Sequence, residues 1–481
     1  MKIDMLVAGQ PAVSVGGGTF ERRNPVTGEV ATVAPAATAA DVPAIVTAAR
    51  EAFAPWSQTG PNERRALLNK AADIMAGKAD EFARLMTAET GSTGPWGGFN
   101  TMLAAGMLRE AAALTTHIKG EIIPSDKPDN LALAVRRPIG VCLGIAPWNA
   151  PVILGTRAIA TAIACGNTVI LKASEMCPAT HRLIGQCFVE AGFPAGVVNV
   201  VTNDPADAAD LVAALISHPD VKHVNFTGST AVGRIIGRLA GENLKPVLLE
   251  LGGKAPLVVL DDADLDGAVN AAVFGSFMNQ GQICMSTERI IVDEKIADAF
   301  VDKLAARAAG LPAGDPRGHV VLGSLVTEAA AEKIDALVSD AVAKGAKLLA
   351  GGKREGAIVK AGVLDGVTEA MRIYREESFG PVKSVIRVKG DEEAIRIAND
   401  TEYGLSAAVH GSDLRRAMAV ARRIESGICH INGPTVSDEA QMPFGGVKAS
   451  GHGRFGGQMG IIAFTDLRWV TIEDPHQHYP F

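Results

Sequence analysis

Short, continuously apolar runs rich in β-branched residues alternate with longer helix-like segments between about residues 140 and 250. Runs of this kind are typical of strands covered on both faces, and the helices between them imply parallel crossovers. The pattern therefore predicts a doubly wound α/β sheet. Its expected strands are Gly140–Ala146, Thr168–Leu171, Val197–Val201, Val221–Phe226 and Pro246–Leu249.

A second series of the same kind follows and predicts a second α/β domain. We expect helices from about Ala263, near Lys295–Arg307 and over Thr327–Lys344. The domains should comprise residues 1–119 with 139–250, and residues 251–449. The expected strands of the second domain are Pro256–Leu260, Arg289–Val292, Val382–Arg387, Ser406–Val409 and Ile428–Ile431.

Two further segments, residues 120–138 and 465–481, are too short to have a core of their own. Unpaired strand edges tend to find partners. We therefore expect an extended arm and a tail strand that pairs with it or with another subunit.

Composition narrows the range of partners. The 481 residues carry a net charge of -7, with 47% hydrophobic and 21% charged residues. Nucleic acid and anionic membranes both need a basic surface, so neither is expected as a partner. No apolar stretch has the length and purity of a signal peptide or a membrane span. We expect a cytoplasmic protein.

Polar residues follow several of the expected strands of the first sheet. They are Asn149, Lys172 with Glu175, Gly228 with Ser229, and Glu250. Ligands of open α/β sheets bind beyond the carboxyl ends of the strands, so these groups should converge at one edge.

Two of these groups suit a dinucleotide, although no GxGxxG fingerprint follows any expected strand. Ser229 or Thr230 can cap a helix containing Gly233, whose free N-terminal amides would suit a pyrophosphate. An ordinary capped crossover helix explains that motif equally well. Lys172 and Glu175 can hold a ribose, and the carboxylate would repel a 2′-phosphate, favouring NAD over NADP. A solvated ion pair is the alternative.

Cys284 lies in the polar, glycine-bearing segment Asn279–Cys284, between an expected helix and an expected strand. A thiol on such a loop can be accessible and oriented, as a nucleophile requires. No CxxC pair or short framework spacing indicates zinc or disulfides. The remaining cysteines are interpreted as small buried hydrophobic residues: Cys142, Cys165, Cys177, Cys187 and Cys429.

Glu250 closes a buried strand beside two glycines. Partial burial would raise its pKa towards the range of a general base. Pairing with Lys254 is the alternative.

No metal site is expected. The acidic run that begins at Asp261 resembles the start of an EF-hand loop, but Val273 occupies the position that needs a bidentate Glu. His476 and His478 have no third ligand nearby in the sequence.

At these residues the chain resembles the aldehyde dehydrogenase superfamily, and the resemblance extends from Asn24 to the tail. The motifs are specific as an ordered set. They are Pro147–Asn149, Lys172–Glu175, Phe226–Ser229, Leu249–Lys254, Gly281–Cys284, Glu376–Pro381 and Pro443–Gly446.

The resemblance implies a Rossmann-like NAD-binding domain, a catalytic domain and a β bridging arm that builds a homodimer or homotetramer. Cys284 would be the nucleophile, Glu250 the general base, and the Asn149 amide with the Cys284 backbone N–H the oxyanion hole. The cofactor NAD, with NADP weaker, would be bound by Pro147, Trp148, Lys172, Glu175, Phe226, Gly228, Ser229, Gly233, Leu251, Glu377 and Phe379.

Within the superfamily the chain is most similar to members that oxidise vanillin, salicylaldehyde or benzaldehyde, in segments such as Cys284–Arg289 and Ile431–Val436. Small Ala150 leaves room for a ring, and Arg157 can bond a ring hydroxyl or methoxy group or form a structural ion pair. The implied substrate pocket consists of Ala150, Leu154, Arg157, Ile283, Met285 and Phe444.

The expected activity is NAD-dependent oxidation of a small aromatic aldehyde, vanillin first, to the carboxylate. A salicylaldehyde, benzaldehyde or broad-specificity dehydrogenase is the alternative. A CoA-acylating relative would normally lack the Glu250 base. A Cys284 hydrolase would need no NAD, and a non-catalytic NAD-binding or structural protein would form no NADH.

Overall fold

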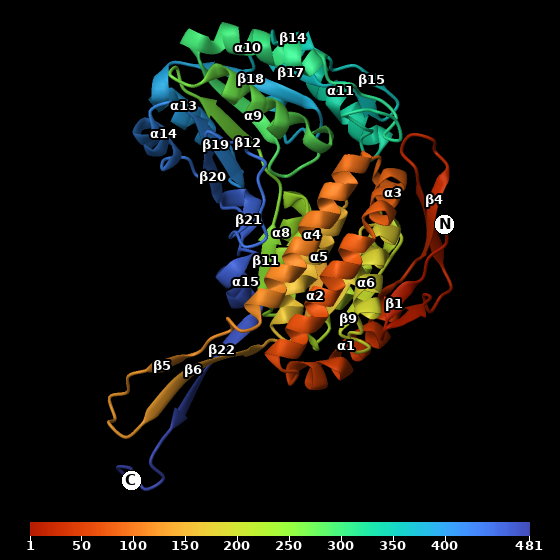
Figure 1. Cartoon of the computed structure of the whole chain (residues 1–481), viewed down its shortest axis with the longest axis vertical. Coiled ribbons are helices and arrows are strands. Elements are labelled where there is room, and N and C mark those ends of the chain that lie inside the picture. Colours follow the sequence, from red (N-terminus) through yellow and green to blue (C-terminus); the bar gives the residue numbers. More distant parts are fainter.

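The computed structural model describes residues 1–481, which form two α/β lobes and a projecting β arm (Figure 1). An eight-stranded sheet organises the first lobe, and its five central strands are parallel. These are the strands predicted from the apolar runs. Antiparallel strands flank them at both edges. The order is β2 (Gln10–Ala12), β1 (Met5–Val7), β9 (Val198–Val201), β8 (Thr168–Lys172), β7 (Val141–Ile145), β10 (Val221–Thr227), β11 (Val247–Glu250) and β21 (Gly451–His452).

Helices cover both faces of this sheet, which explains why its strands lack polar alternation. Helix α5 is buried along its whole length because it lies between the sheet and an outer helical layer. One face packs against α5 (Pro151–Ala164), α6 (Pro178–Ala191) and, outside them, α2 (Pro61–Gly77), α3 (Ala79–Thr90) and α4 (Gly94–Leu114). The other packs against α1 (Val42–Ser57), α7 (Ala208–Ser217) and α8 (Thr230–Glu242).

The second lobe has a seven-stranded sheet that is parallel except for β14 at one edge. Its order is β14 (Lys347–Ala350), β17 (Gly362–Asp365), β18 (Val382–Val388), β13 (Thr287–Asp293), β12 (Ala255–Val259), β19 (Ser406–His410) and β20 (Ile428–Ile431). One face packs against α9 (Leu265–Phe277) and α10 (Glu294–Ala309), and the other against α11 (Glu328–Ala343), α12 (Arg372–Arg375), α13 (Gly390–Asn399) and α14 (Leu414–Ala421).

The chain then returns to the first lobe through β21 and α15 (Gly457–Ala463) before entering the arm. In the arm, β6 (Leu131–Pro138) pairs with β5 (Glu121–Ile123) on one side and with β22 (Thr465–Ile472) on the other, all antiparallel. The tail strand therefore pairs with the arm, as predicted. Figure 1 shows this sheet projecting away from both lobes, with the C-terminus at its far end. Two small hairpins complete the fold: β3 (Thr19–Arg23) with β4 (Val30–Pro35), and β15 (Arg354–Glu355) with β16 (Ile358–Val359).

The prediction that all cysteines other than Cys284 are buried is wrong at one position. Cys429 is exposed, whereas Cys142, Cys165, Cys177 and Cys187 are buried. The reason is that Cys429 lies on β20, the last strand of its sheet, which has a neighbour on one side only.

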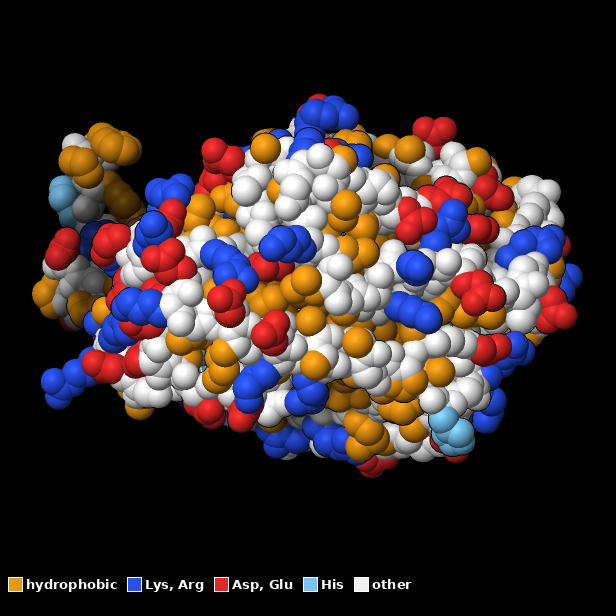
Figure 2. Space-filling model, turned by 90° about the horizontal axis from the view of Figure 1, so that it is seen from above, with side chains coloured by type: hydrophobic (Ala, Val, Ile, Leu, Met, Phe, Trp, Pro, Cys, Tyr) orange, Lys and Arg blue, Asp and Glu red, His pale blue; other side chains and the backbone are white.

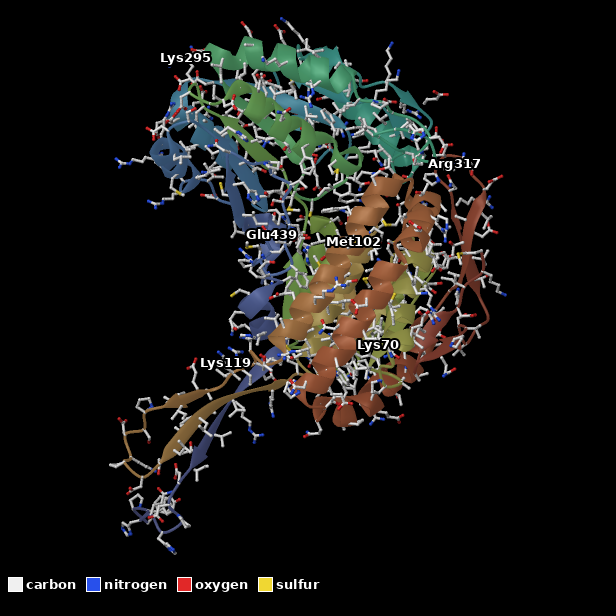
Figure 3. All side chains as sticks on the ribbon, in the orientation of Figure 1. Lys70, Met102, Lys119, Lys295, Arg317 and Glu439 are labelled. Atoms are coloured by element: carbon white, nitrogen blue, oxygen red, sulfur yellow. The ribbon has the colours of Figure 1, made fainter.

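The surface in Figure 2 mixes both signs of charge, and neither gathers into a single-sign patch on that face. None of the helices combines the length and apolar character that crossing a bilayer requires. In Figure 3, Met102 of α4 and Glu439 lie at about the same height of the view, below the second lobe.

Candidate active site

Cys284 lies at the junction of the lobes, at the end of a strained loop. After α9, Asn279, Gln280 and Gly281 have φ of 47°, 57° and 72°, all in the left-handed region. A Cβ at Gly281 would lie 2.3 Å from the Gly380 carbonyl oxygen, so only glycine fits there. Such strain persists only where the surroundings hold it. Here the Gln280 side-chain amide donates to the Ser324 carbonyl at 2.9 Å.

Asn149 is fixed beside this loop. Its Nδ2 donates one hydrogen to the Gln282 carbonyl at 3.0 Å. The backbone carbonyl oxygen of Asn149 accepts hydrogen bonds from Trp96 Nε1 at 3.1 Å and from Asn279 Nδ2 at 2.9 Å. The Asn149 amide is therefore held close to Cys284 and retains a second hydrogen for another acceptor.

Glu250, at the carboxyl end of β11, is 1% exposed, and neither carboxylate oxygen has a hydrogen-bond partner. Burial raises the pKa of Glu250 to about 8, and Arg157 opposes the shift. Lys254, the alternative ion-pair partner, instead contacts Glu288 at 2.6 Å. A buried, unpaired carboxyl with a pKa near neutrality has the properties of a general base.

The Cys284 thiol is half-buried. Burial raises its pKa, and the nearby carboxylates of Glu250 and Glu377 raise it further. Burial also raises the pKa of Glu377 to about 7. The thiol is therefore protonated at rest, and a base must take its proton before it can act as a nucleophile.

Two cavities meet at Cys284, and Asn149 and Leu154 also line both. The first, of about 350 Å³, is mainly apolar. Every residue predicted for the substrate pocket lines it: Ala150, Leu154, Arg157, Ile283, Met285 and Phe444. Sequence reasoning missed Trp96, Phe99, Leu103, Ile153, Phe274, Met278, Pro434, Val436, Ser437 and Asp438. The spacing of Trp96, Phe99 and Leu103 along one face of α4 was the available signal.

Arg157 lines this first cavity and is also ion-paired. Its Nη2 lies 2.5 Å from Asp438 Oδ2, and its guanidinium carbon lies 4.2 Å from the centre of the Phe444 ring. The other carboxylate oxygen of Asp438 is buried without a partner. Arg157 therefore both lines the cavity and forms an ion pair, and the two interpretations do not exclude each other.

The second cavity, of about 220 Å³, is more polar. The predicted cofactor residues that line it are Pro147, Trp148, Gly228, Ser229, Leu251, Glu377 and Phe379. Thr227 and Gly252 also line it and were missed. Lys172, Glu175, Phe226 and Gly233 lie outside its lining.

Of the predicted cofactor residues outside the lining, Lys172, Phe226 and Gly233 are buried and Glu175 is partly exposed. Lys172 and Glu175 form an ion pair at the end of β8, and Asn203 Nδ2 donates to the Glu175 carboxylate at 3.0 Å. This pair is shielded from solvent, unlike the solvated pair considered as its alternative. Gly233 packs against Leu251, which a Cβ at position 233 would approach to 2.3 Å.

No cluster of three or more His, Cys, Asp or Glu side chains is arranged to hold a metal ion. His476 and His478 lie beyond β22, in the tail of the chain.

Several known proteins are similar to this chain in sequence and in structure. A vanillin dehydrogenase from Pseudomonas fluorescens is 60% identical over 481 residues, covering 100% of both chains. A salicylaldehyde dehydrogenase from Pseudomonas putida is 52% identical, covering 96% of each. The crystal structure of a salicylaldehyde dehydrogenase from Pseudomonas putida G7 complexed with salicylaldehyde matches with a TM-score of 0.98 at 50% identity, covering 100% of both chains.

The fold of these relatives confirms the predicted fold class. The model of the aldehyde dehydrogenase family matches residues 13–470. The chain therefore belongs to the aldehyde dehydrogenase family.

Proposed function

We propose that the protein oxidises an aromatic aldehyde, vanillin or a related hydroxybenzaldehyde, to the carboxylate with NAD. The observation that carries this proposal is the meeting of an apolar, aromatic-lined cavity and a polar cavity at one cysteine, Cys284. The names of the relatives, vanillin and salicylaldehyde dehydrogenases, support the aromatic substrate.

The polar cavity has features that fit a dinucleotide. Gly228 and Ser229 stand at the N-terminus of α8, where free backbone N–H groups and the helix dipole favour a pyrophosphate. The Glu377 carboxylate is fixed by the Gly253 N–H at 2.9 Å and faces the same cavity. Glu175, held by Lys172, would accept from ribose hydroxyls and repel a 2′-phosphate, so we assign NAD as the preferred cofactor.

The chemistry begins at Cys284. Glu250 or water takes the thiol proton, and the sulfur bonds to the aldehyde carbon to give a thiohemiacetal. The free hydrogen of the Asn149 amide and the Cys284 backbone N–H stabilise the developing oxyanion. One such donor typically contributes roughly 3 to 4 kcal/mol to transition-state stabilisation.

When bound in the polar cavity, NAD would accept the hydride that leaves the thiohemiacetal carbon, and a thioester would remain on Cys284. Glu250 then removes a proton from water, which attacks the thioester carbon and releases the carboxylate and the Cys284 thiol. The sum is aldehyde, NAD and water giving carboxylate, NADH and protons.

The apolar cavity favours a flat ring. Ala150 leaves space at its wall, while Trp96 and Phe99 provide aromatic surface. Arg157 is the cationic donor in this wall and suits a ring hydroxyl or methoxy oxygen.

We assign cofactor binding to residues 1–119 and 139–250, and catalysis to residues 251–449. Residues 120–138 and 465–481 would build a homodimer or homotetramer. The exposed apolar side chains of this arm support the last assignment, and Trp469 is 76% exposed.

The test measures NADH formation with vanillin, salicylaldehyde, benzaldehyde and hexanal. We expect the aromatic aldehydes to have the higher kcat/KM, and product analysis to give the free acid. A far higher kcat/KM for hexanal would contradict the aromatic assignment. Absence of NADH formation with every aldehyde would contradict the dehydrogenase.

A further inference from the structure

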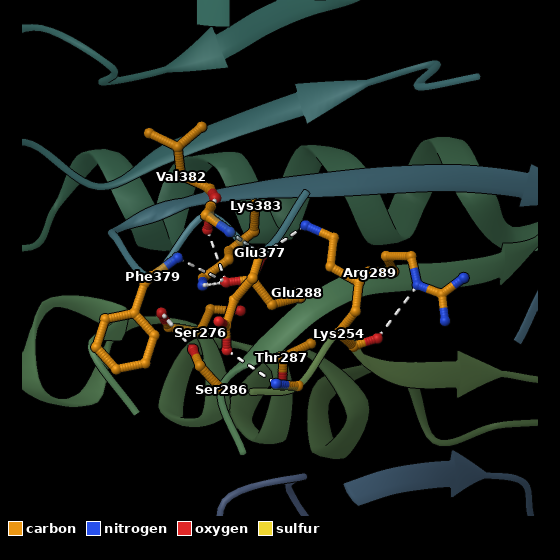
Figure 4. Close-up of polar contacts among 12 residues, drawn as sticks. Lys254, Ser276, Ser286, Thr287, Glu288, Arg289, Glu377, Phe379, Val382 and Lys383 are labelled. Carbon is orange, nitrogen blue, oxygen red and sulfur yellow. Dashed lines mark hydrogen bonds and ion pairs between the residues drawn. The ribbon is translucent and has the colours of Figure 1, made fainter. Parts of the chain in front are cut away.

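Glu288 is a buried carboxylate on β13, four residues after Cys284, with no part in the steps above. It is 2% exposed and accepts five hydrogen bonds, so its charge is fully compensated (Figure 4). The donors are the Ser378 N–H at 2.9 Å, Ser378 Oγ at 2.7 Å, the Phe379 N–H at 3.2 Å, Lys254 Nζ at 2.6 Å and Lys383 Nζ at 3.1 Å.

Three of these bonds come from the segment that carries Glu377 and Phe379, both of which line the polar cavity. Phe379 has a φ of 51°, a conformation that residues other than glycine rarely adopt, so it depends on its surroundings. Its ring meets Trp148 edge-on at 5.7 Å between centroids. Glu288 therefore fixes the backbone on which these cavity-facing side chains stand.

Lys254 connects the same carboxylate to the other wall of the cavity. Its Nζ also donates to the Glu376 carbonyl at 2.6 Å. The preceding residue, Gly253, donates its N–H to Glu377. A single carboxylate thus joins the segment around Glu377 to the glycine loop that follows Glu250.

The cluster depends on charge as well as shape. Glu288 is the only carboxylate paired with Lys254 or Lys383, and both lysines are fully buried. Burial alone would raise the pKa of Glu288, but the two ammonium groups hold it well below its ordinary value. Removing the negative charge would leave two buried cations without an anion, and the cavity wall would have to move.

We propose that Glu288 is a positioning residue for the cofactor. It holds Glu377 and Phe379 in the wall of the cavity assigned to NAD, and it acts on the cofactor side of Cys284 alone. This inference rests on the proposed function, since it assigns the polar cavity to NAD.

The experiment compares wild type with Glu288→Gln. NAD affinity is measured by calorimetry without aldehyde, and the rate of Cys284 alkylation by iodoacetamide is followed by mass spectrometry. We expect Kd and KM for NAD to rise about tenfold, because Glu377 and Phe379 are no longer held in place for the cofactor. The alkylation rate and the KM for vanillin should change by less than about twofold, which is below 0.5 kcal/mol.

The matched control is Asp293→Asn. Asp293 lies at the other end of β13, is 4% exposed, and accepts the N–H groups of Lys295 and Gly390, each at 3.0 Å. We expect this variant to lose stability and to keep the wild-type Kd for NAD.

Ser378→Ala decides the matter if Glu288→Gln does not fold, because it leaves the charge of Glu288 in place. It removes the 2.7 Å bond from Oγ to Glu288 and a longer 3.4 Å bond from Oγ to the Val382 carbonyl. It should raise Kd for NAD by about threefold. Unchanged NAD affinity in the folded variants, or equal losses in alkylation and NAD binding, would overturn the role of Glu288. Failure of wild type to bind NAD would instead overturn the proposed function.

Discussion

Glu250 and Glu288 show how two buried carboxylates near one cysteine receive opposite properties from their surroundings. Glu250 has no hydrogen-bond partner, and burial raises its pKa to about 8. Glu288 is almost equally buried, but two lysines and the Ser378 hydroxyl keep its pKa low. The residue type does not determine the role. The role follows from the number of hydrogen-bond donors around each carboxylate. Glu250 has none and can exchange protons, whereas Glu288 has five and holds the surrounding structure.

The largest expected effect comes from removing the sulfur of Cys284. Cys284→Ala should form no measurable NADH from vanillin, because no other side chain can form the thioester. NAD affinity by calorimetry should remain near that of wild type. Residual turnover above background would contradict the role of Cys284.

Glu250→Gln tests whether Glu250 is the carboxylate that exchanges protons. The amide cannot take a proton from water, so kcat should fall by about 10²- to 10⁴-fold. A burst of NADH followed by slow turnover should appear in stopped-flow measurements. A fall in NAD affinity with unchanged kcat would mean that Glu250 acts as a holding residue, like Glu288.

The pH dependence of thioester hydrolysis tests the difference between Glu250 and Glu288 further. Glu250 must be ionised to act as a base, and its pKa is raised to about 8. Thioester hydrolysis should therefore quicken about tenfold per pH unit below that value and level off above it. In Glu250→Gln the hydrolysis rate should no longer rise with pH in this way, whereas in Ser378→Ala the rise should remain. A flat profile in wild type would exclude Glu250 as the titrating group.

A smaller effect than those of Cys284 and Glu250 is expected on the aldehyde side. Arg157→Met is combined with Asp438→Asn so that no unpaired carboxylate remains. The double variant should raise the KM for vanillin about fivefold, or about 1 kcal/mol, because one hydrogen bond to a ring oxygen is lost. Benzaldehyde, which has no ring oxygen to accept from Arg157, serves as the matched substrate. Equal effects on both aldehydes would show that Arg157 only shapes the wall.

The local sequence pattern was sufficient to predict the central strands and the polar residues that follow them. Asn149 and Glu250 follow apolar runs, and the parallel sheet brings such ends together. The Lys254–Glu288 pair was not predicted, because Glu288 lies on β13 and Lys254 lies in the loop just before β12, and only the order of the sheet makes them neighbours. Asp438 was missed for the same reason, since only the fold brings its loop beside α5. Sequence reasoning also placed Cys429 in the interior because it cannot tell an edge strand from a central one.

The central claim is that an aromatic aldehyde becomes covalently attached to Cys284 and is oxidised there. Rapid quenching of Glu250→Gln with vanillin and NAD, followed by peptide mass spectrometry, tests it directly. The account predicts a vanilloyl thioester on Cys284 that forms only when NAD is present. Absence of the adduct while NADH accumulates, or its appearance on another residue, would contradict the account.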